Sequence, residues 1–271
     1  MTGSRPALSE TGSGEPVLLL APAATRANVW QLYQTPALVS GGYRVLSYDT
    51  RGTNKEFSPA GEYRLADLAA DAAWVIREAG HGPCHLVGAS LGAMTAQLLA
   101  SLRPDLVRSL TLLGTRARTP AFTEALIRAV AGAARDNTVS AEYSAASTLS
   151  QLFAPETLLD DGFAHDWLEL MTMFPIRGDG VAQQYLSTLV HDEHADALAT
   201  IGCPALVVSF EHDLLMPSAL VREVAEAIPD ARYREIPGTG HFGFLERPDE
   251  VCTELLRFLS PQRQNPVTLP Q

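Results

Sequence analysis

The chain has 271 residues, with 20 Lys and Arg against 31 Asp and Glu and a formal net charge of -11. Nucleic-acid binding requires clustered Lys and Arg, so this acidic balance argues against a nucleic-acid partner. No stretch reaches the roughly 18 consecutive apolar residues of a membrane span, and residues 1–15 lack the pattern of a secretory signal. At about 150 residues per domain, the length lies between one domain and two.

The elements follow one another in a regular order. Short apolar runs between Gly and Pro residues predict buried strands at 17–20, 43–48, 84–88, 109–113, 205–210 and 233–236. Apolar residues at helical spacing predict helices at 65–79, 91–102, 220–228 and 250–259. Alternation of strand and helix indicates an α/β fold: a doubly wound, mostly parallel sheet with helices on both faces.

One segment interrupts this alternation. Residues 115–200 contain no convincing strand, and helical patterns fill 122–134, 141–153, 163–174 and 181–189. We therefore predict a core formed by residues 1–114 and 201–271, with residues 115–200 as a helical insertion.

Three cysteines, Cys84, Cys203 and Cys252, cannot all pair, and none belongs to a C-x-x-C motif. Neither a disulfide framework nor a zinc ribbon is predicted, and we expect a reduced, cytoplasmic setting. His191 and His194 could face one way on a helix, but the acidic residues around them indicate a solvated face. Nucleotide-binding glycine motifs are missing. We predict no metal and no cofactor, and the expected partner is a small-molecule substrate; the oligomeric state stays open.

The run Gly88-Ala89-Ser90-Leu91-Gly92 fits the pattern G-x-S-x-G. It stands directly after a predicted strand and before a predicted helix, where a sharp turn would strain Ser90 and expose its hydroxyl. The flanking positions must be small because the backbones crowd there, and both are glycine. An ordinary glycine-rich turn is the alternative, and the strand–turn–helix context favours a nucleophile.

The sequence resembles the α/β-hydrolase family along most of its length, in the family's order of serine, acid and histidine. The matching landmarks are the strand from Val17, Asp49-Thr50-Arg51-Gly52, Gly88–Gly92, Phe210–Pro217 and Gly238–Phe242. The resemblance implies a sheet of about seven to eight strands. Only about sixteen residues precede Val17, so the family's first strand is expected to be missing or very short.

The resemblance also assigns a catalytic triad. The family's acid opens a D-x-x-x-P run, which is Asp213 here, and its histidine ends a G-x-G-H loop, which is His241. His241 would take the proton of Ser90, and Asp213 would orient the imidazole. Glu211 precedes the D-x-x-x-P run, and His212 should point away from its neighbour, so neither is favoured.

An oxyanion hole needs two backbone donors. One should be the N–H of Leu91, the residue after the nucleophile. The second should come from the loop after Leu20, where this chain has Ala21-Pro22 instead of the family's His-Gly. Because Pro22 has no N–H, the expected donor is Ala23, with Ala24 as second choice.

Two further landmarks carry expectations. The D-x-R-G turn is expected to be structural, with Arg51 joining neighbouring loops. In the family, a helical insertion at this place forms a lid over the nucleophile. Apolar lid residues would then line the substrate pocket together with Phe242, although a stripe at helical spacing is most often core packing. The candidate pocket residues are Trp167, Met171, Met173, Phe174 and Phe242.

These features predict a serine hydrolase that cleaves a carboxylic ester, thioester or lactone of a small, largely apolar substrate through an acyl-enzyme. The same scaffold supports C–C bond hydrolases, perhydrolases, acyltransferases and cyclases. A non-catalytic small-molecule receptor is the alternative of another class.

Overall fold

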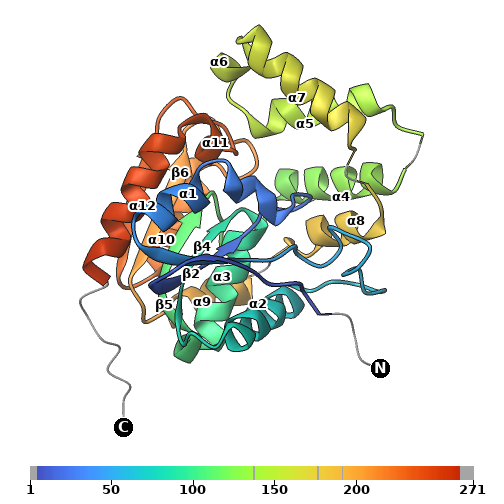
Figure 1. Ribbon diagram of the computed structural model, residues 1–271. Coiled ribbons are helices and arrows are strands. Elements are labelled where there is room, and N and C mark those ends of the chain that lie inside the picture. Colours follow the sequence, from blue (N-terminus) through green and yellow to red (C-terminus); the bar gives the residue numbers. More distant parts are fainter. Residues whose placement is uncertain (1–4, 137, 176, 191, 263–271) are drawn as a thin grey trace.

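The computed structural model describes residues 5–136, 138–175, 177–190 and 192–262 (Figure 1). Its seven strands form one sheet in the order β1-β3-β2-β4-β5-β6-β7, and only β1 is antiparallel to its neighbour. The mostly parallel sheet is as predicted. The strands are β1 (Ser9–Gly12), β2 (Glu15–Leu20), β3 (Tyr43–Ser47), β4 (Cys84–Ala89), β5 (Val107–Leu113), β6 (Ala205–Phe210) and β7 (Ala231–Ile236).

The first strand exists but is only four residues long. Strand β1 pairs with β3 from Ser9 opposite Ser47 to Gly12 opposite Arg44, and all four of its residues are exposed. Gly12 has φ +83°, and a Cβ there would lie 2.6 Å from the carbonyl oxygen of Tyr43. The side chains of Glu10 and Arg44 form an ion pair that ties this edge strand to the sheet.

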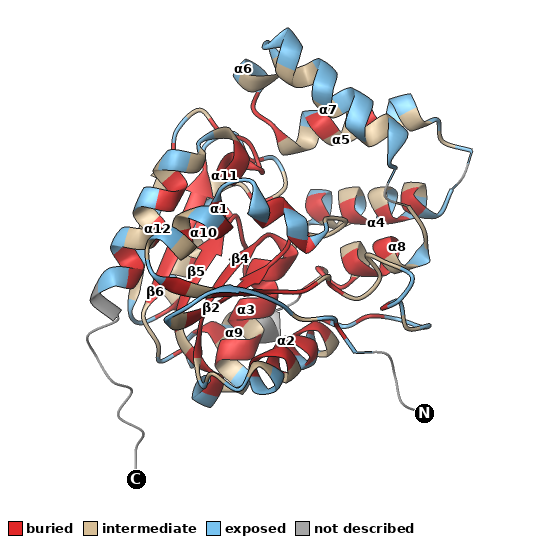
Figure 2. Cartoon of the chain, viewed as in Figure 1, coloured by how far each residue is buried: buried red, intermediate tan, exposed pale blue. Residues whose placement is uncertain are grey.

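Helices cover both faces of the sheet, which explains why the central strands β4 and β6 are buried along their whole length (Figure 2). One face packs against α2, α3, α9 and α10, and the other against α1, α11 and α12. The bounds of these helices are α1 (Gln34–Ser40), α2 (Leu65–Ala79), α3 (Leu91–Leu102), α9 (Asp192–Leu198), α10 (Ser218–Ala227), α11 (Gly243–Glu246) and α12 (Pro248–Gln262). Two short 3-10 helices, Ala27–Gln31 and Pro104–Leu106, complete the core.

The described part of the segment between β5 and β6 contains helices joined by loops, and no strand. Its helices before α9 are α4 (Ala121–Arg135), α5 (Ala141–Leu152), α6 (Pro155–Leu158), α7 (Asp161–Met173) and α8 (Asp179–Leu186). Helix α9 lies inside the range 115–200 but packs with α3 and α10 in the core, through Leu198 and Ala195. The part of the segment that lies outside the helical layers on the two faces of the sheet is therefore α4–α8.

Helices α4–α8 form two packed groups (Figure 1). Helices α4 and α8 pack against each other, with Ala131, Ala134, Val181 and Ala182 buried between them. Helices α5–α7 pack through Phe153 and Trp167 on the core cluster that includes α12. In Figure 2 the outer surface of α7 is exposed, and no residue of this helix is fully buried. Among the described helices, none is both long and apolar enough to cross a membrane.

Candidate active site

Ser90 stands on a strained turn between β4 and α3. Its backbone has φ 53° and ψ -116°, a conformation that non-glycine residues avoid. The Ser90 N–H donates to the carbonyls of Leu113 (3.0 Å) and Gly114 (3.1 Å) at the end of β5. The turn places Ser90 at the carboxyl end of β4, at the N-terminus of α3, with 9% of the residue exposed.

The two glycines of the motif are required by contact. A Cβ on Gly88 would lie 2.4 Å from the carbonyl carbon and oxygen of Gly92, and one on Gly92 would lie 2.0 Å from the carbonyl oxygen of Leu20. The predicted crowding of backbones is therefore present. It allows α3 to begin directly against β2 and β4.

Asp213 and His241 form a buried pair at the same edge of the sheet. The Nδ1 of His241 is 2.7 Å from Asp213 Oδ2, and both side chains are almost fully buried. Asp213 Oδ1 accepts the N–H groups of Leu215 and Met216, each at 2.8 Å. A carboxylate can only accept, so Nδ1 carries the proton toward Asp213 and Nε2 is left as a proton acceptor.

Gly114 is the common neighbour of the three residues. Its carbonyl accepts the Ser90 N–H. It has φ +56°, and a Cβ there would lie 3.1 Å from Asp213 Oδ2 and 3.6 Å from His241 Nδ1. Among the described residues no hydrogen bond joins Ser90 Oγ to His241, and such bonds are often long before substrate is bound.

The rejected alternatives lie elsewhere. Glu211 accepts the N–H of Gly238 at 2.8 Å. His212 is partly exposed, with its Nε2 3.9 Å from Glu156 on α6. Among the described residues, no hydrogen bond or ion pair joins either side chain to the His241–Asp213 pair.

The structure distinguishes the two expected donors of the loop after β2. The N–H of Ala24 donates to Gln184 Oε1 of α8 at 2.7 Å, so this group is already engaged. No hydrogen bond within the described chain occupies the N–H of Ala23 or of Leu91. Ala24 has φ 55°. Ser90 and Ala24 are the only described non-glycine residues with positive φ, and backbone strain of this kind clusters at functional sites.

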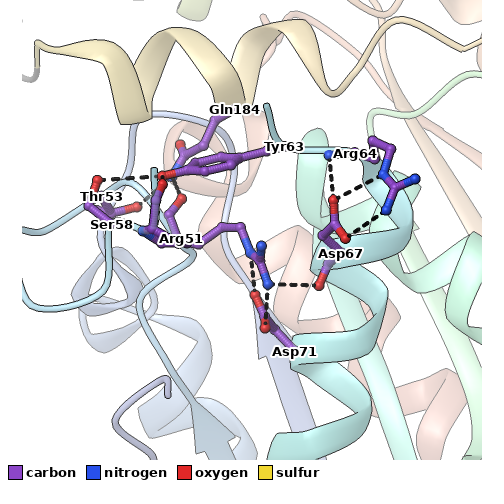
Figure 3. Close-up of polar contacts among 9 residues, drawn as sticks. Arg51, Thr53, Ser58, Tyr63, Arg64, Asp67, Asp71 and Gln184 are labelled. Carbon is purple, nitrogen blue, oxygen red and sulfur yellow. Dashed lines mark hydrogen bonds and ion pairs between the residues drawn. The ribbon is translucent and has the colours of Figure 1, made fainter. Parts of the chain in front are cut away.

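The D-x-R-G turn is a structural clamp, in agreement with the role predicted for Arg51 (Figure 3). Arg51 makes two charged hydrogen bonds to Asp71 on α2, at 2.6 and 2.7 Å, and its guanidinium lies over the rings of Phe57 and Tyr63. Burial raises the pKa of Asp71, and Arg51 acts in the opposite direction. Asp49 accepts the N–H of Ala27 at 2.9 Å and so fixes the loop after β2.

Two side chains connect the insertion to the loops of this site, and no sequence motif pointed to either of them. Glu246 accepts the N–H of Gly240 (2.6 Å) in the histidine loop and the N–H of Ala154 (2.8 Å) between α5 and α6. Gln184 bonds to the loop after β2 and to the D-x-R-G turn. Both side chains are ordinary in sequence, and only the fold brings their partners together.

Arg116 is a third residue without a sequence motif. It is 2% exposed, and its guanidinium donates to Met216 Sδ and to the carbonyl of Thr188, both at 2.8 Å. Burial lowers the pKa of Arg116 to about 10, and the negative charge of Asp213 acts in the opposite direction. Arg116 thus joins the acid loop to the chain after α8.

The candidate pocket residues separate into two groups. Phe242 is buried and stacked on His241, with ring centroids 5.9 Å apart, and Phe153 connects it to Trp167 at 5.1 Å. Met171 packs on the same cluster. Met173 and Phe174, at the end of α7, are 57% and 67% exposed.

The potential metal ligands give no cluster in the described chain, where no three His, Cys, Asp or Glu residues are gathered as a metal site would require. His191 lies outside the described residues, and the side chain of His194 is also outside them. Cys84, Cys203 and Cys252 are free thiols.

The sheet, the strained serine after β4, and the acid and histidine after β6 and β7 define the class of α/β hydrolases. The sequence pattern of the alpha/beta hydrolase fold family matches residues 16–248. The chain belongs to this family and is an enzyme of it.

The alignments with related proteins extend over almost the whole chain. A putative non-heme bromoperoxidase, BpoC, of Mycobacterium tuberculosis H37Rv is 33% identical over 94% of this chain and 97% of the relative. Its crystal structure superposes with a TM-score of 0.89 over 96% of this chain and 97% of that one. A putative carbamate hydrolase, RutD, of Azorhizobium caulinodans is 28% identical over 91% of this chain and 92% of the relative. A thermophilic esterase from Thermogutta terrifontis is 25% identical with a TM-score of 0.84, covering 96% and 94% of the two chains.

Proposed function

We propose that this α/β hydrolase is a serine hydrolase that cleaves a carboxylic ester, thioester or lactone. The observation that carries the proposal is the buried 2.7 Å contact between His241 Nδ1 and Asp213 Oδ2, beside a serine with φ 53°. This contact leaves Nε2 as the proton acceptor that a serine nucleophile needs.

In the proposed mechanism, Ser90 Oγ attacks the carbonyl carbon while His241 Nε2 takes the hydroxyl proton. The N–H groups of Leu91 and Ala23 receive the negative charge of the carbonyl oxygen. His241 then returns the proton to the leaving group, and an acyl-enzyme forms. Water, activated by His241, releases the acid and restores Ser90.

The relatives support hydrolysis at a carbonyl centre. The esterase from Thermogutta terrifontis and the putative carbamate hydrolase from Azorhizobium caulinodans are both named for such reactions. Carboxylic esters and carbamates both contain a bond between an acyl carbon and a heteroatom. An ester, thioester or lactone presents the same bond to Ser90.

The substrate is proposed to be small or medium-sized and largely apolar, covered by α4–α8 acting as a lid. Phe242 supports this, because it is buried, stacked on His241, and continuous with Phe153 and Trp167 of the lid. Met171 adds an adaptable apolar side chain to this wall. On this view the lid residues set the acyl specificity.

The test combines a substrate panel with a serine-directed fluorophosphonate probe. We expect ester, thioester or lactone turnover and probe labelling that Ser90→Ala abolishes, while Ser150→Ala, an exposed serine on α5, changes neither. Tight ligand binding by the wild-type protein without turnover or labelling would instead support a receptor.

A perhydrolase is the second candidate, favoured by the bromoperoxidase name of the 33% identical relatives. In that reaction hydrogen peroxide, rather than water, attacks the acyl-enzyme, and a peracid and free Ser90 are the products. Peracid formation from an ester and hydrogen peroxide at a rate above that of hydrolysis would favour this candidate.

A further inference from the structure

The side chain of Gln184 joins α8 to the loop after β2 and to the D-x-R-G turn. Figure 3 shows it beside Arg51 and Thr53 of that turn region. It is fully buried on α8. Its Oε1 accepts the N–H of Ala24 at 2.7 Å, and its Nε2 donates to the carbonyl of Arg51 at 2.7 Å and to Thr53 Oγ1 at 2.8 Å. The orientation of the amide is unambiguous, because an N–H partner requires the oxygen and a carbonyl partner requires the nitrogen.

Ala24, which Gln184 holds, is in a conformation that costs free energy. Ala24 has φ 55°, and a non-glycine residue in this left-handed region is strained and persists only where its surroundings enforce it. The enforcing contact here is the bond to Gln184, and the Thr25 hydroxyl donates to the Ala23 carbonyl at 3.1 Å on the other side of the same peptide group. Together these two bonds set the plane of the peptide between Ala23 and Ala24.

The position of Gln184 is itself fixed by a close backbone contact. A Cβ on Gly180, one turn earlier on α8, would lie 2.6 Å from the Cα of Gly52, and one on Gly52 would lie 2.6 Å from the carbonyl oxygen of Gly180. Helix α8 is thus seated directly on the D-x-R-G turn, which Arg51 anchors to α2 through Asp71. A shift of α8 would therefore move the amide that holds Ala24.

We infer that Gln184 is a positioning residue of the oxyanion hole, an inference that rests on the proposed function. By engaging the N–H of Ala24 it keeps that residue in its left-handed conformation, and so directs the preceding N–H of Ala23 toward the space above Ser90. The lid helix α8 thereby organises the catalytic loop as well as covering it.

The test uses the full chain, a 4-nitrophenyl ester of a short acyl chain and the fluorophosphonate probe. Gln184→Met keeps the length of the side chain and removes both hydrogen-bonding functions. We expect kcat and the labelling rate to fall at least tenfold, with KM changed by less than about threefold, because transition-state contacts are lost and substrate contacts are kept. Gln183→Met, a buried glutamine on the same helix, is the matched control and should leave both unchanged.

Rescue separates positioning from a general role in packing. Glycine adopts positive φ without strain. Adding Ala24→Gly to Gln184→Met should therefore restore at least half of the decrease in log kcat that Gln184→Met causes. A purely structural role of Gln184 in seating α8 would not respond to Ala24→Gly. Thr53→Val, which removes one anchor of the Gln184 amide, is the milder variant if Gln184→Met does not fold, and its expected fall of about threefold should be relieved in the same way.

The outcomes distinguish this inference from the proposed function. Wild-type protein that neither turns over the ester nor is labelled at Ser90 overturns both. Active wild-type protein with Gln184→Met activity within threefold of it overturns the positioning role alone. The same holds if Ala24→Gly gives no rescue, since the loss would then arise from displaced packing of α8.

Discussion

Gly114 lies against Asp213 so closely that a methyl group on its Cα would be 3.1 Å from the carboxylate oxygen that contacts His241. The same glycine has φ +56° and accepts the N–H of Ser90 through its carbonyl. One residue at the end of β5 therefore fixes the distance between the serine turn and the acid–histidine pair. Gly114 has no reactive side chain, yet its small size lets the loops that carry Ser90, Asp213 and His241 approach one another.

Gly114→Ala should reduce catalysis more than stability. The added Cβ pushes on the Asp213 carboxylate and shifts His241, so we expect kcat to fall about 10- to 100-fold, with a cost of about 1–2 kcal/mol in the free energy of unfolding. Gly80→Ala is the control, since Gly80 has φ +70° with nothing within 4 Å of its Cβ position. It should show a similar stability cost and unchanged kcat. Equal kcat for the two variants would contradict the role of Gly114.

Glu246→Gln should loosen the histidine loop. The carboxylate accepts the N–H groups of Gly240 and Ala154, and an amide would turn its NH2 group toward one of these donors. We expect a loss of about 2 kcal/mol in the free energy of unfolding, measured by denaturant titration, and a lower kcat. Glu254→Gln removes an exposed pair with Arg257 and should cost less than about 0.5 kcal/mol. Equal stability losses would refute the special position of Glu246.

The three cysteines should be poor nucleophiles in the folded chain. Burial raises the pKa of Cys252 to about 11 and those of Cys84 and Cys203 to about 12, from an ordinary value of 9.0. A disulfide reagent such as DTNB should therefore react at pH 8 at least 100-fold more slowly with folded than with guanidinium-unfolded protein. Rapid reaction of the native protein would contradict this burial.

The same thiols make stability depend on alkaline pH. Their folded pKa values lie above the unfolded value, so the unfolded chain releases protons first as pH rises above 9. Their contribution to stability is complete below pH 9 and is lost progressively between pH 9 and about 12. The melting temperature should fall over this window, and replacing Cys252 by Ala should flatten the fall.

The lid proposal predicts how activity depends on acyl length. If Trp167 and Met171 belong to an apolar wall beside His241, esters with acyl chains from two to eight carbons should not lose activity steadily with length. Trp167→Ala should lower kcat/KM for the longer esters by roughly tenfold and change that for acetate much less, because the lost contact is with the acyl tail. A steady decline in the wild-type enzyme from two to eight carbons would contradict an apolar pocket.

Local rules predicted much of this molecule because they depend on neighbouring residues. Gly88 to Gly92 is readable since a strand, a tight turn and a helix succeed one another along the chain, and the acid and histidine follow later strands in the family's order. The boundary of the insertion was harder to predict from the sequence. The helical patterns in the sequence end at residue 189, before α9, and only the packing of α9 on α3 and α10 assigns it to the core.

Sequence by itself therefore predicted the fold class and the tight turn at Ser90, because both follow from the local order of strand, turn and helix. It also proposed Asp213 and His241 as the acid and the base, through the resemblance to the family. Only the tertiary structure decided which loop donor is free, since the N–H of Ala24 is engaged by a glutamine 160 positions away. It also decided that Gly114 and Glu246 hold the loops together. Such contacts join segments that are far apart in the sequence. They depend on tertiary packing, which a local pattern of residues does not predict.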